Sequence, residues 1–282
     1  MSTVPGPSPI IARIEALGAF VRSGLIRVRA GIVYLGGVVA LVLETGYRLI
    51  RAVRGGADRI RLEALVAQAV RFGVRSIPIV VLIHAVMGVI LALNLKPTLE
   101  LYGQVERVAD VIAIAVLREL GPLITAVILS GYAGASIAAE LGAMVEGEEI
   151  KALRAHALDP IRFLVAPRIV TTTVMMVGLT VLADVVAVSG GLLTSVTVFG
   201  VSTQTYLDQT QWAVTHRDYL VGLAKGGVFG AIIAAVACYE GLNVRGGAEG
   251  VGRATTTTVV KSIVGLILAD CVFTVVFYIV GW

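Results

Sequence analysis

The chain has 282 residues, of which 57% are hydrophobic and only 15% are charged, and its formal net charge is +4. A soluble domain of this size carries nearer a quarter charged residues, so this chain has too little polar surface to cover a core in water. The composition therefore excludes an ordinary soluble protein and predicts an all-α integral membrane protein. We assign the basic excess to membrane topology and expect no nucleic-acid partner.

The first 60 residues are predicted to form an amphipathic, interfacial region. Apolar residues recur on one helical face between Ile10 and Val28, which favours a helix at the membrane surface. A solvated helix packed on a soluble partner is the alternative. The uncharged stretch 30–43 has 14 residues, short of the roughly 20 needed to span, so it is interpreted as interfacial or re-entrant. Residues 48–61 read as a basic connector.

Five later stretches are long and apolar enough to cross a bilayer: residues 76–95, 108–139, 163–200, 219–239 and 262–282. The polar stretches 202–218 and 243–261 are predicted to be loops. With this topology, 18 Lys and Arg residues lie on the side of the N-terminus and 3 on the other. The positive-inside rule therefore predicts a cytoplasmic N-terminus and an extracytoplasmic C-terminus.

Small residues recur every fourth position in two of these spans. The first set is Gly134, Ala138 and Gly142, and the second is Gly222, Gly226, Gly230 and Ala234. Small residues at this spacing let helix backbones approach closely, so the pattern predicts tight helix packing.

Charged residues inside the spans are candidates for function, because ionisable groups in a membrane are costly and mark a pathway or a pair. They are Arg118, Glu119, Asp184, Lys225 and Asp270. Adjacent residues on a helix do not face one another, so Arg118 and Glu119 need separate partners. Pro122 removes a backbone hydrogen bond and predicts a kink. This segment either lines a substrate path or holds a structural salt bridge, for instance from Arg118 to Asp184 or Asp270.

The charged segment 140–160 is predicted to contain a short cytoplasmic helix. Ile150, Leu153 and Ala157 form an apolar stripe, and Asp159-Pro160 is expected to end the helix. Such a helix is suited to docking on a soluble partner, although an ordinary solvated loop helix has the same pattern.

The sequence shows no catalytic or metal-binding pattern, so we expect no enzyme. Its three histidines are scattered, and it has no Walker A loop, so any ATP must be bound by another chain. Two alternatives to an ATP-driven permease remain. One is a secondary transporter driven by protons through Glu119, Asp184 and Asp270, and the other is a membrane scaffold without transport.

Several motifs resemble one family in matching order. They are Leu117-Arg-Glu-Leu-Gly-Pro-Leu-Ile, Ala139-Glu-Leu-Gly-Ala-Met, Glu148-Glu-Ile-Lys-Ala-Leu, Asp159-Pro-Ile-Arg and Gly250-Val-Gly-Arg-Ala-Thr-Thr-Thr-Thr-Val-Val. This set resembles the MlaE/YrbE permease family over about residues 60–282. The resemblance implies a permease domain at 61–282, with an N-terminal interfacial helix followed by five transmembrane helices.

The resemblance further implies a multi-pass bacterial inner-membrane subunit of an ABC transporter. Such a permease moves phospholipid or a related lipid between the inner membrane and a hexameric extracytoplasmic MCE-domain protein. It is a homodimer and works with two cytoplasmic ATPase subunits, which bind ATP and Mg. Some such complexes also contain a small cytoplasmic STAS-type subunit. The permease itself binds no cofactor.

The resemblance also suggests roles for particular residues. Glu119 of the Arg-Glu-Leu-Gly-Pro motif is expected near the lipid pocket, together with Arg118 and with Tyr132, which stands where many members have Arg. The coupling helix that faces the ATPase maps to about residues 140–159. Its candidate contacts are Glu140, Glu148, Glu149, Leu153 and Arg154.

Overall fold

A computed structural model describes residues 9–53 and 62–281, and every regular element in these ranges is helical. The all-α membrane fold class is thereby confirmed. The chain divides into two compact units, Met1–Glu44 and Thr45–Trp282. The boundary near residue 60 and the homodimer stay predictions.

Helix α1 runs without interruption from Pro9 to Val53. The predicted surface helix and the apolar stretch after it therefore belong to one element. Its segment Gly24–Arg51 is long and apolar enough to span, so six described helices meet that criterion where five were expected. The uncharged stretch 30–43 is bounded by Arg29 and Glu44, and its 14 residues are too few to span. The helix continues past both charged residues, so the apolar segment is longer than the uncharged stretch. The interfacial placement of this segment stays a prediction.

The other five helices with the length and composition of a span match the five predicted ones; all five begin earlier than predicted, and the third and the last end one or two residues before the predicted limit. The first comprises α2 (Leu62–Gln68), the π-helical turn η1 (Ala69–Gly73), the 3-10 turn η2 (Val74–Ser76) and α3 (Ile77–Leu101). The second comprises η3 (Val105–Arg107), α4 (Val108–Ala115), the π-helical turn η4 (Val116–Leu120), α5 (Gly121–Leu129), the π-helical turn η5 (Ser130–Gly134) and α6 (Ala135–Glu146). The third comprises the π-helical turn η6 (Ile161–Val165) and α8 (Ala166–Phe199), and the last two are α10 (His216–Leu242) and α11 (Gly247–Val280).

The predicted loop 202–218 is largely helical, which corrects the sequence prediction. Helix α9 (Thr203–Ala213) starts at Ser202, whose hydroxyl accepts a hydrogen bond from the backbone N–H of Thr205 at 3.0 Å. Tyr206 is 1% exposed and donates its hydroxyl to the Val188 carbonyl at 3.2 Å. A polar segment can thus be a helix when a cap and one buried anchor hold it.

The predicted loop 243–261 is also wrong beyond Gly246, because α11 begins at Gly247. The threonine run lies inside this helix. Thr255 and Thr256 donate their hydroxyls to the Gly252 carbonyl at 2.6 and 3.3 Å. Hydroxyls satisfied by their own helix can enter an apolar environment, so a run of threonines does not by itself indicate a loop.

A π-helical turn precedes Pro122. In η4 the N–H of Gly121 donates to the carbonyl of Val116, five residues earlier. Pro122 lacks an N–H, and an inserted π turn is one way in which a helix accommodates such a gap. The irregularity expected at Pro122 is therefore present as a π turn, and it carries Arg118 and Glu119.

Close packing at the small residues is confirmed. A Cβ atom added at Gly222 would overlap the Leu117 carbonyl, and one at Gly230 would overlap Met176 and the backbone of Thr172. Helix α10 packs on α8, α6, α5 and α11.

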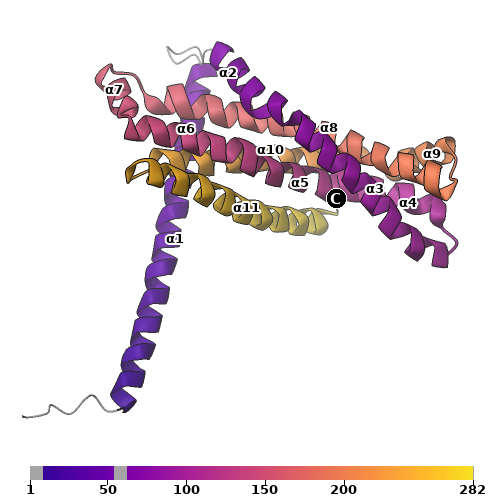
Figure 1. The fold of residues 1–282 in the computed structure, drawn as a ribbon, viewed down its shortest axis with the longest axis horizontal. Coiled ribbons are helices and arrows are strands. Elements are labelled where there is room, and N and C mark those ends of the chain that lie inside the picture. Colours follow the sequence, from indigo (N-terminus) through magenta and orange to yellow (C-terminus); the bar gives the residue numbers. More distant parts are fainter. Residues whose placement is uncertain (1–8, 54–61, 282) are drawn as a thin grey trace, which may run out of the picture. The chain divides into compact units, whose positions relative to one another are not determined.

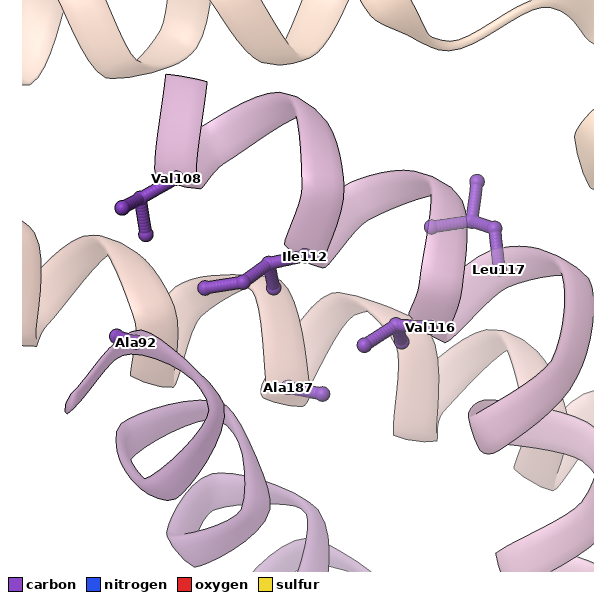
Figure 2. Packing of buried hydrophobic residues seen from close by; sticks show 6 residues of the cluster. All are labelled: Ala92, Val108, Ile112, Val116, Leu117 and Ala187. Atoms are coloured by element: carbon purple, nitrogen blue, oxygen red, sulfur yellow. The ribbon is translucent and has the colours of Figure 1, made fainter. Parts of the chain in front are cut away.

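Figure 1 shows α7 (Glu149–Ala155) and α9 at opposite ends of the bundle. Near the α9 end, α3, α4, η4 and α8 enclose a cluster of small and medium apolar side chains (Figure 2). Its members are Ala92, Val108, Ile112, Val116, Leu117 and Ala187.

Candidate functional site

Three of the charged residues picked from separate spans meet in one cluster. Lys225 of α10 is 1% exposed and forms an ion pair with Glu119 of η4. Its ammonium also lies 2.8 Å from Asp270 of α11, as an ion pair without hydrogen-bond geometry. One buried cation therefore holds carboxylates from two other elements. Such pairing offsets the large desolvation cost of a buried charge.

Thr274 completes this cluster. Its hydroxyl accepts a hydrogen bond from Lys225 at 3.2 Å and donates one to Glu119 at 3.1 Å. Glu119 is 38% exposed, in contrast to Lys225 behind it. The cluster thus presents a carboxylate outward and keeps its cation inside.

A pocket of about 150 Å³ opens in front of the cluster. Its lining combines charged, hydroxyl and aromatic groups: Arg118, Glu119, Val221, Lys225, Thr274, Phe277 and Tyr278. Arg118 and Glu119 both line this pocket, and their role in binding substrate stays a prediction. Its mixed lining is suited to the polar part of an amphiphilic molecule.

Arg118 pairs with Asp218, which is not one of the two partners expected from the sequence, Asp184 and Asp270. Its guanidinium lies 3.2 Å from Asp218, whose side chain is 9% exposed. Asp218 also accepts a hydrogen bond from the backbone N–H of Thr215 at 2.9 Å, so it caps α10 as well. Arg118 remains 35% exposed and faces the pocket.

Asp184 and Tyr132 do not line this pocket. Asp184 is 3% exposed, and its Oδ1 has no hydrogen-bond partner among the described residues. The carboxylate lies so close to Gly121 that a Cβ there would overlap it, which accounts for glycine before Pro122. Tyr132 lies on η5 with 40% of its surface exposed. Its substrate role stays a prediction.

The predicted coupling segment contains a shorter helix than expected. Helix α7 covers Glu149–Ala155, and Glu148 precedes it with a left-handed φ of 59°. The helix ends before Ala157, which has a φ of 56°, so the expected stop at Asp159-Pro160 is wrong. Asp159 instead accepts a hydrogen bond from the N–H of Ile161, the first residue of η6, at 3.1 Å.

Helix α7 has one buried face and one exposed face. Ile150 is 7% exposed and packs inside the chain, so the predicted apolar stripe is only partly accessible. Leu153 is half-buried, whereas Glu149 and Arg154 are exposed. Glu148 and Lys151 form an exposed ion pair at 2.6 Å, which lowers the pKa of the Glu148 carboxyl through its hydrogen bond to Lys151.

Glu140 does not lie on α7. It is on α6, where its two oxygens lie 3.1 Å from Arg168 and 3.0 Å from Arg71. Arg168 is 3% exposed and donates to the Leu164 carbonyl at 2.7 Å. Glu140 therefore joins the helices on both sides of α7 to η1, and its contact with an ATPase stays a prediction.

The sequence did not point to Asp218 or Thr274, nor to the pocket residues Val221, Phe277 and Tyr278. Asp218 lies at the end of the predicted loop 202–218, and its spacing to Thr215 fits a capping box. Thr274 gave no signal, because a threonine in an apolar span is ordinary. Among the described residues, no group of His, Cys, Asp and Glu could hold a metal ion.

Comparison with known proteins places the chain in a family. The sequence profile described as permease MlaE matches residues 65–276. A probable ABC transporter permease protein of Rickettsia conorii is 35% identical over 217 residues, which cover 77% of this chain and 84% of the relative. The Arabidopsis thaliana chloroplastic protein TRIGALACTOSYLDIACYLGLYCEROL 1 is 31% identical over 240 residues, 85% of this chain and 68% of the relative.

A further relative is named for its transport system. The intermembrane phospholipid transport system permease protein MlaE of Haemophilus influenzae is 30% identical over 240 residues, which cover 84% of this chain and 92% of the relative. The family profile covers most of the chain, and the helices long enough to span fit a multi-pass membrane subunit. The chain therefore belongs to the MlaE permease family and is a transport subunit of ABC type.

Proposed function

We propose that this permease moves a phospholipid, or a related lipid, between the inner membrane and an extracytoplasmic MCE-domain protein. The observation that carries the proposal is the pocket in front of Lys225. There a guanidinium and a carboxylate lie beside Phe277 and Tyr278 within apolar helices. The name of the Haemophilus influenzae relative, a phospholipid transport permease, supports the same substrate class.

Each part of the pocket has a role in this proposal. Arg118, which is partly exposed and paired with Asp218, is the donor for a lipid phosphate, because a guanidinium has several N–H groups that suit phosphate oxygens. Glu119 and Thr274 meet the remaining polar groups of the lipid. Lys225 and Asp270 hold Glu119 in place from behind. The lipid chains lie against the apolar surface of the spans.

The proposed assembly follows the family. Two copies of the chain form the permease, and separate cytoplasmic ATPase subunits bind ATP and Mg. A hexameric MCE protein receives or delivers the lipid, and a STAS-type subunit can be added. The N-terminus is proposed to be cytoplasmic and the C-terminus extracytoplasmic. Helix α7 meets the ATPase through Glu149, Leu153 and Arg154, with Glu148 at its start.

Lipid transfer by the reconstituted complex tests the pocket. Arg118→Ala with Glu119→Ala should lower both ATP-dependent lipid transfer and the lipid that co-purifies. Glu106→Ala, an exposed acid outside the pocket, is the control. Unchanged transfer and lipid content in the double variant would show that the pocket assignment is wrong. Transfer that needs a proton gradient and no ATP would favour a secondary transporter.

A second experiment tests the coupling role of α7. Glu149→Lys with Leu153→Ala should reduce ATPase binding and transfer while leaving bound lipid unchanged. Gln211→Lys introduces a charge on exposed α9 at the other end of the bundle and is the control. Full ATPase binding and transfer in the α7 variant would exclude the coupling role.

A further inference from the structure

A second polar pocket, of about 180 Å³, lies at the turn between α10 and α11. It is lined by Glu240, Asn243, Val244, Arg245, Gly250, Arg253, Ala254 and Thr257. Val244 packs where a Cβ on Gly142 would lie, near the end of α6. The pocket therefore lies at the end of the bundle that carries α7 (Figure 1), the side proposed above to be cytoplasmic.

The charges of this pocket favour an anion. Its acid, Glu240, is already paired with Lys261 at 2.7 Å. Arg245 and Arg253 are exposed, and neither forms an ion pair with a described carboxylate. The Arg253 guanidinium donates to the Arg245 carbonyl at 3.4 Å, which keeps it over the turn. The first N–H groups of the long helix α11 begin beside them and add positive potential.

The surface beside the pocket favours a lipid as the source of that anion. Arg253, Thr257, Val260 and Val264 follow one another at helical spacings of three and four, so they share one face of α11. Val260 and Val264 are 57% and 53% exposed. The same face continues to Tyr278, which lines the pocket in front of Lys225.

We propose that this pocket binds the phosphate of an inner-leaflet phospholipid whose chains lie along the exposed face of α11. The volume is too small for acyl chains, so they must lie outside it. The inference rests on the proposed lipid transport and adds a loading site at the opposite end of α11 from the pocket of Arg118 and Glu119. Two guanidinium groups give the phosphate charge-assisted hydrogen bonds.

Binding of a short-chain phosphatidylglycerol to the purified full-length chain in detergent tests the site. The measurement uses an Arg118→Ala, Glu119→Ala background, so the first pocket is removed from the signal. Arg253→Gln should weaken binding roughly tenfold, and adding Arg245→Gln should weaken it further. Arg253→Lys should keep part of the affinity. Arg75→Gln, at another exposed arginine, should change it less than about twofold.

Three outcomes would overturn the inference. The first is equal lipid affinity with and without the two arginines. The second is inorganic phosphate binding as tightly as the lipid, which would mean that the chains add nothing. The third is loss of ATPase co-purification with lipid affinity unchanged, which would assign the pocket to an acidic protein segment. Failure of the proposed function is separate, because it is measured as absent lipid transfer by the unmodified complex.

Discussion

Helices α10 and α11 are neighbours that are both apolar enough to span, yet their surroundings are opposite. In the most apolar 18-residue stretch of α10, 61% of the residues are buried, whereas in the corresponding stretch of the more apolar α11 only 11% are buried. Lipid tails are as apolar as leucine, so hydrophobicity does not drive one helix against another in a bilayer. The comparison teaches that shape and polar partners, and not apolar content, decide which helix becomes central.

The side chains of the two helices explain the difference. Helix α10 has glycine at 222, 226 and 230, each of which lies against a neighbouring helix, and it carries the buried cation Lys225. Helix α11 presents bulky residues such as Val264 and Val272 outward, 53% and 61% exposed. Its acid Asp270 faces inward to Lys225.

Loss of the buried cation should have the largest effect on stability. Lys225→Met leaves Glu119 and Asp270 without their partner and should lower the free energy of unfolding by about 3–5 kcal/mol. Lys261→Met on α11 removes a lysine that is 40% exposed and should cost less than about 1 kcal/mol. Thermal unfolding in detergent measures both. Equal shifts would contradict the contrast, and adding Glu119→Gln and Asp270→Asn to Lys225→Met should restore part of the stability.

The second-largest difference between α10 and α11 should appear in the stability lost when an apolar side chain is truncated. Ile233→Ala on α10 empties a fully buried position and should cost about 2–4 kcal/mol. Val264→Ala on α11 should change stability by less than about 0.5 kcal/mol. The shift in unfolding temperature of each purified variant is the measurement. A large loss at Val264 would sharpen the comparison, because it would show that another chain covers this face.

The smallest possible side-chain addition should also distinguish the helices. Gly222→Ala places a Cβ against the Leu117 carbonyl and should destabilise the chain by about 1–3 kcal/mol. Gly252→Ala on α11 meets open space and should stabilise it by up to about 1 kcal/mol, because alanine favours helix. The fraction of monodisperse protein after heating reports both. A neutral Gly222→Ala would mean that α10 and η4 can move apart freely.

Helix α9 extends the comparison to a polar helix held by one buried residue. Burial raises the pKa of the Tyr206 phenol to about 12, above its ordinary value near 10. The folded state therefore keeps the phenol proton up to a higher pH than the unfolded state does. The stability that the protonated phenol confers is lost as pH rises from about 10 towards 12. Tyr206→Phe should cost about 1 kcal/mol at neutral pH and flatten this alkaline loss. Unfolding midpoints measured between neutral and alkaline pH check it.

Part of the candidate site could be predicted from the sequence. Glu119, Lys225 and Asp270 were each recognisable, because a charge in an apolar run is visible without a structure. Their joining into one cluster was not, since the three residues lie on separate helices. The pairing of Arg118 with Asp218 could not be predicted for the same reason, because Asp218 is distant in sequence and lies outside the predicted span.

The limits of the helices, like the site, could be predicted from the sequence only in part. The centres of five spans followed from apolar length, whereas α9 and the start of α11 did not, because capping by Ser202 and the internal bonding of Thr255 make polar segments helical. Glu140 was grouped with α7 by its position in the chain. Its place between Arg71 and Arg168 depends on how α6, α8 and η1 approach one another.

The sequence by itself determined that the chain is a bundle of membrane helices, that α10 is suited to close packing, and which few charges lie inside it. These are local properties, because apolar length, small-residue spacing and charge can be read along one helix at a time. Only the tertiary structure decided which charges pair, which face of α11 is left open and which residues line the pocket. Lipid tails solvate the apolar surface of every span about equally well, so hydrophobicity does not select among these arrangements. They depend instead on contacts between helices that are far apart in the chain.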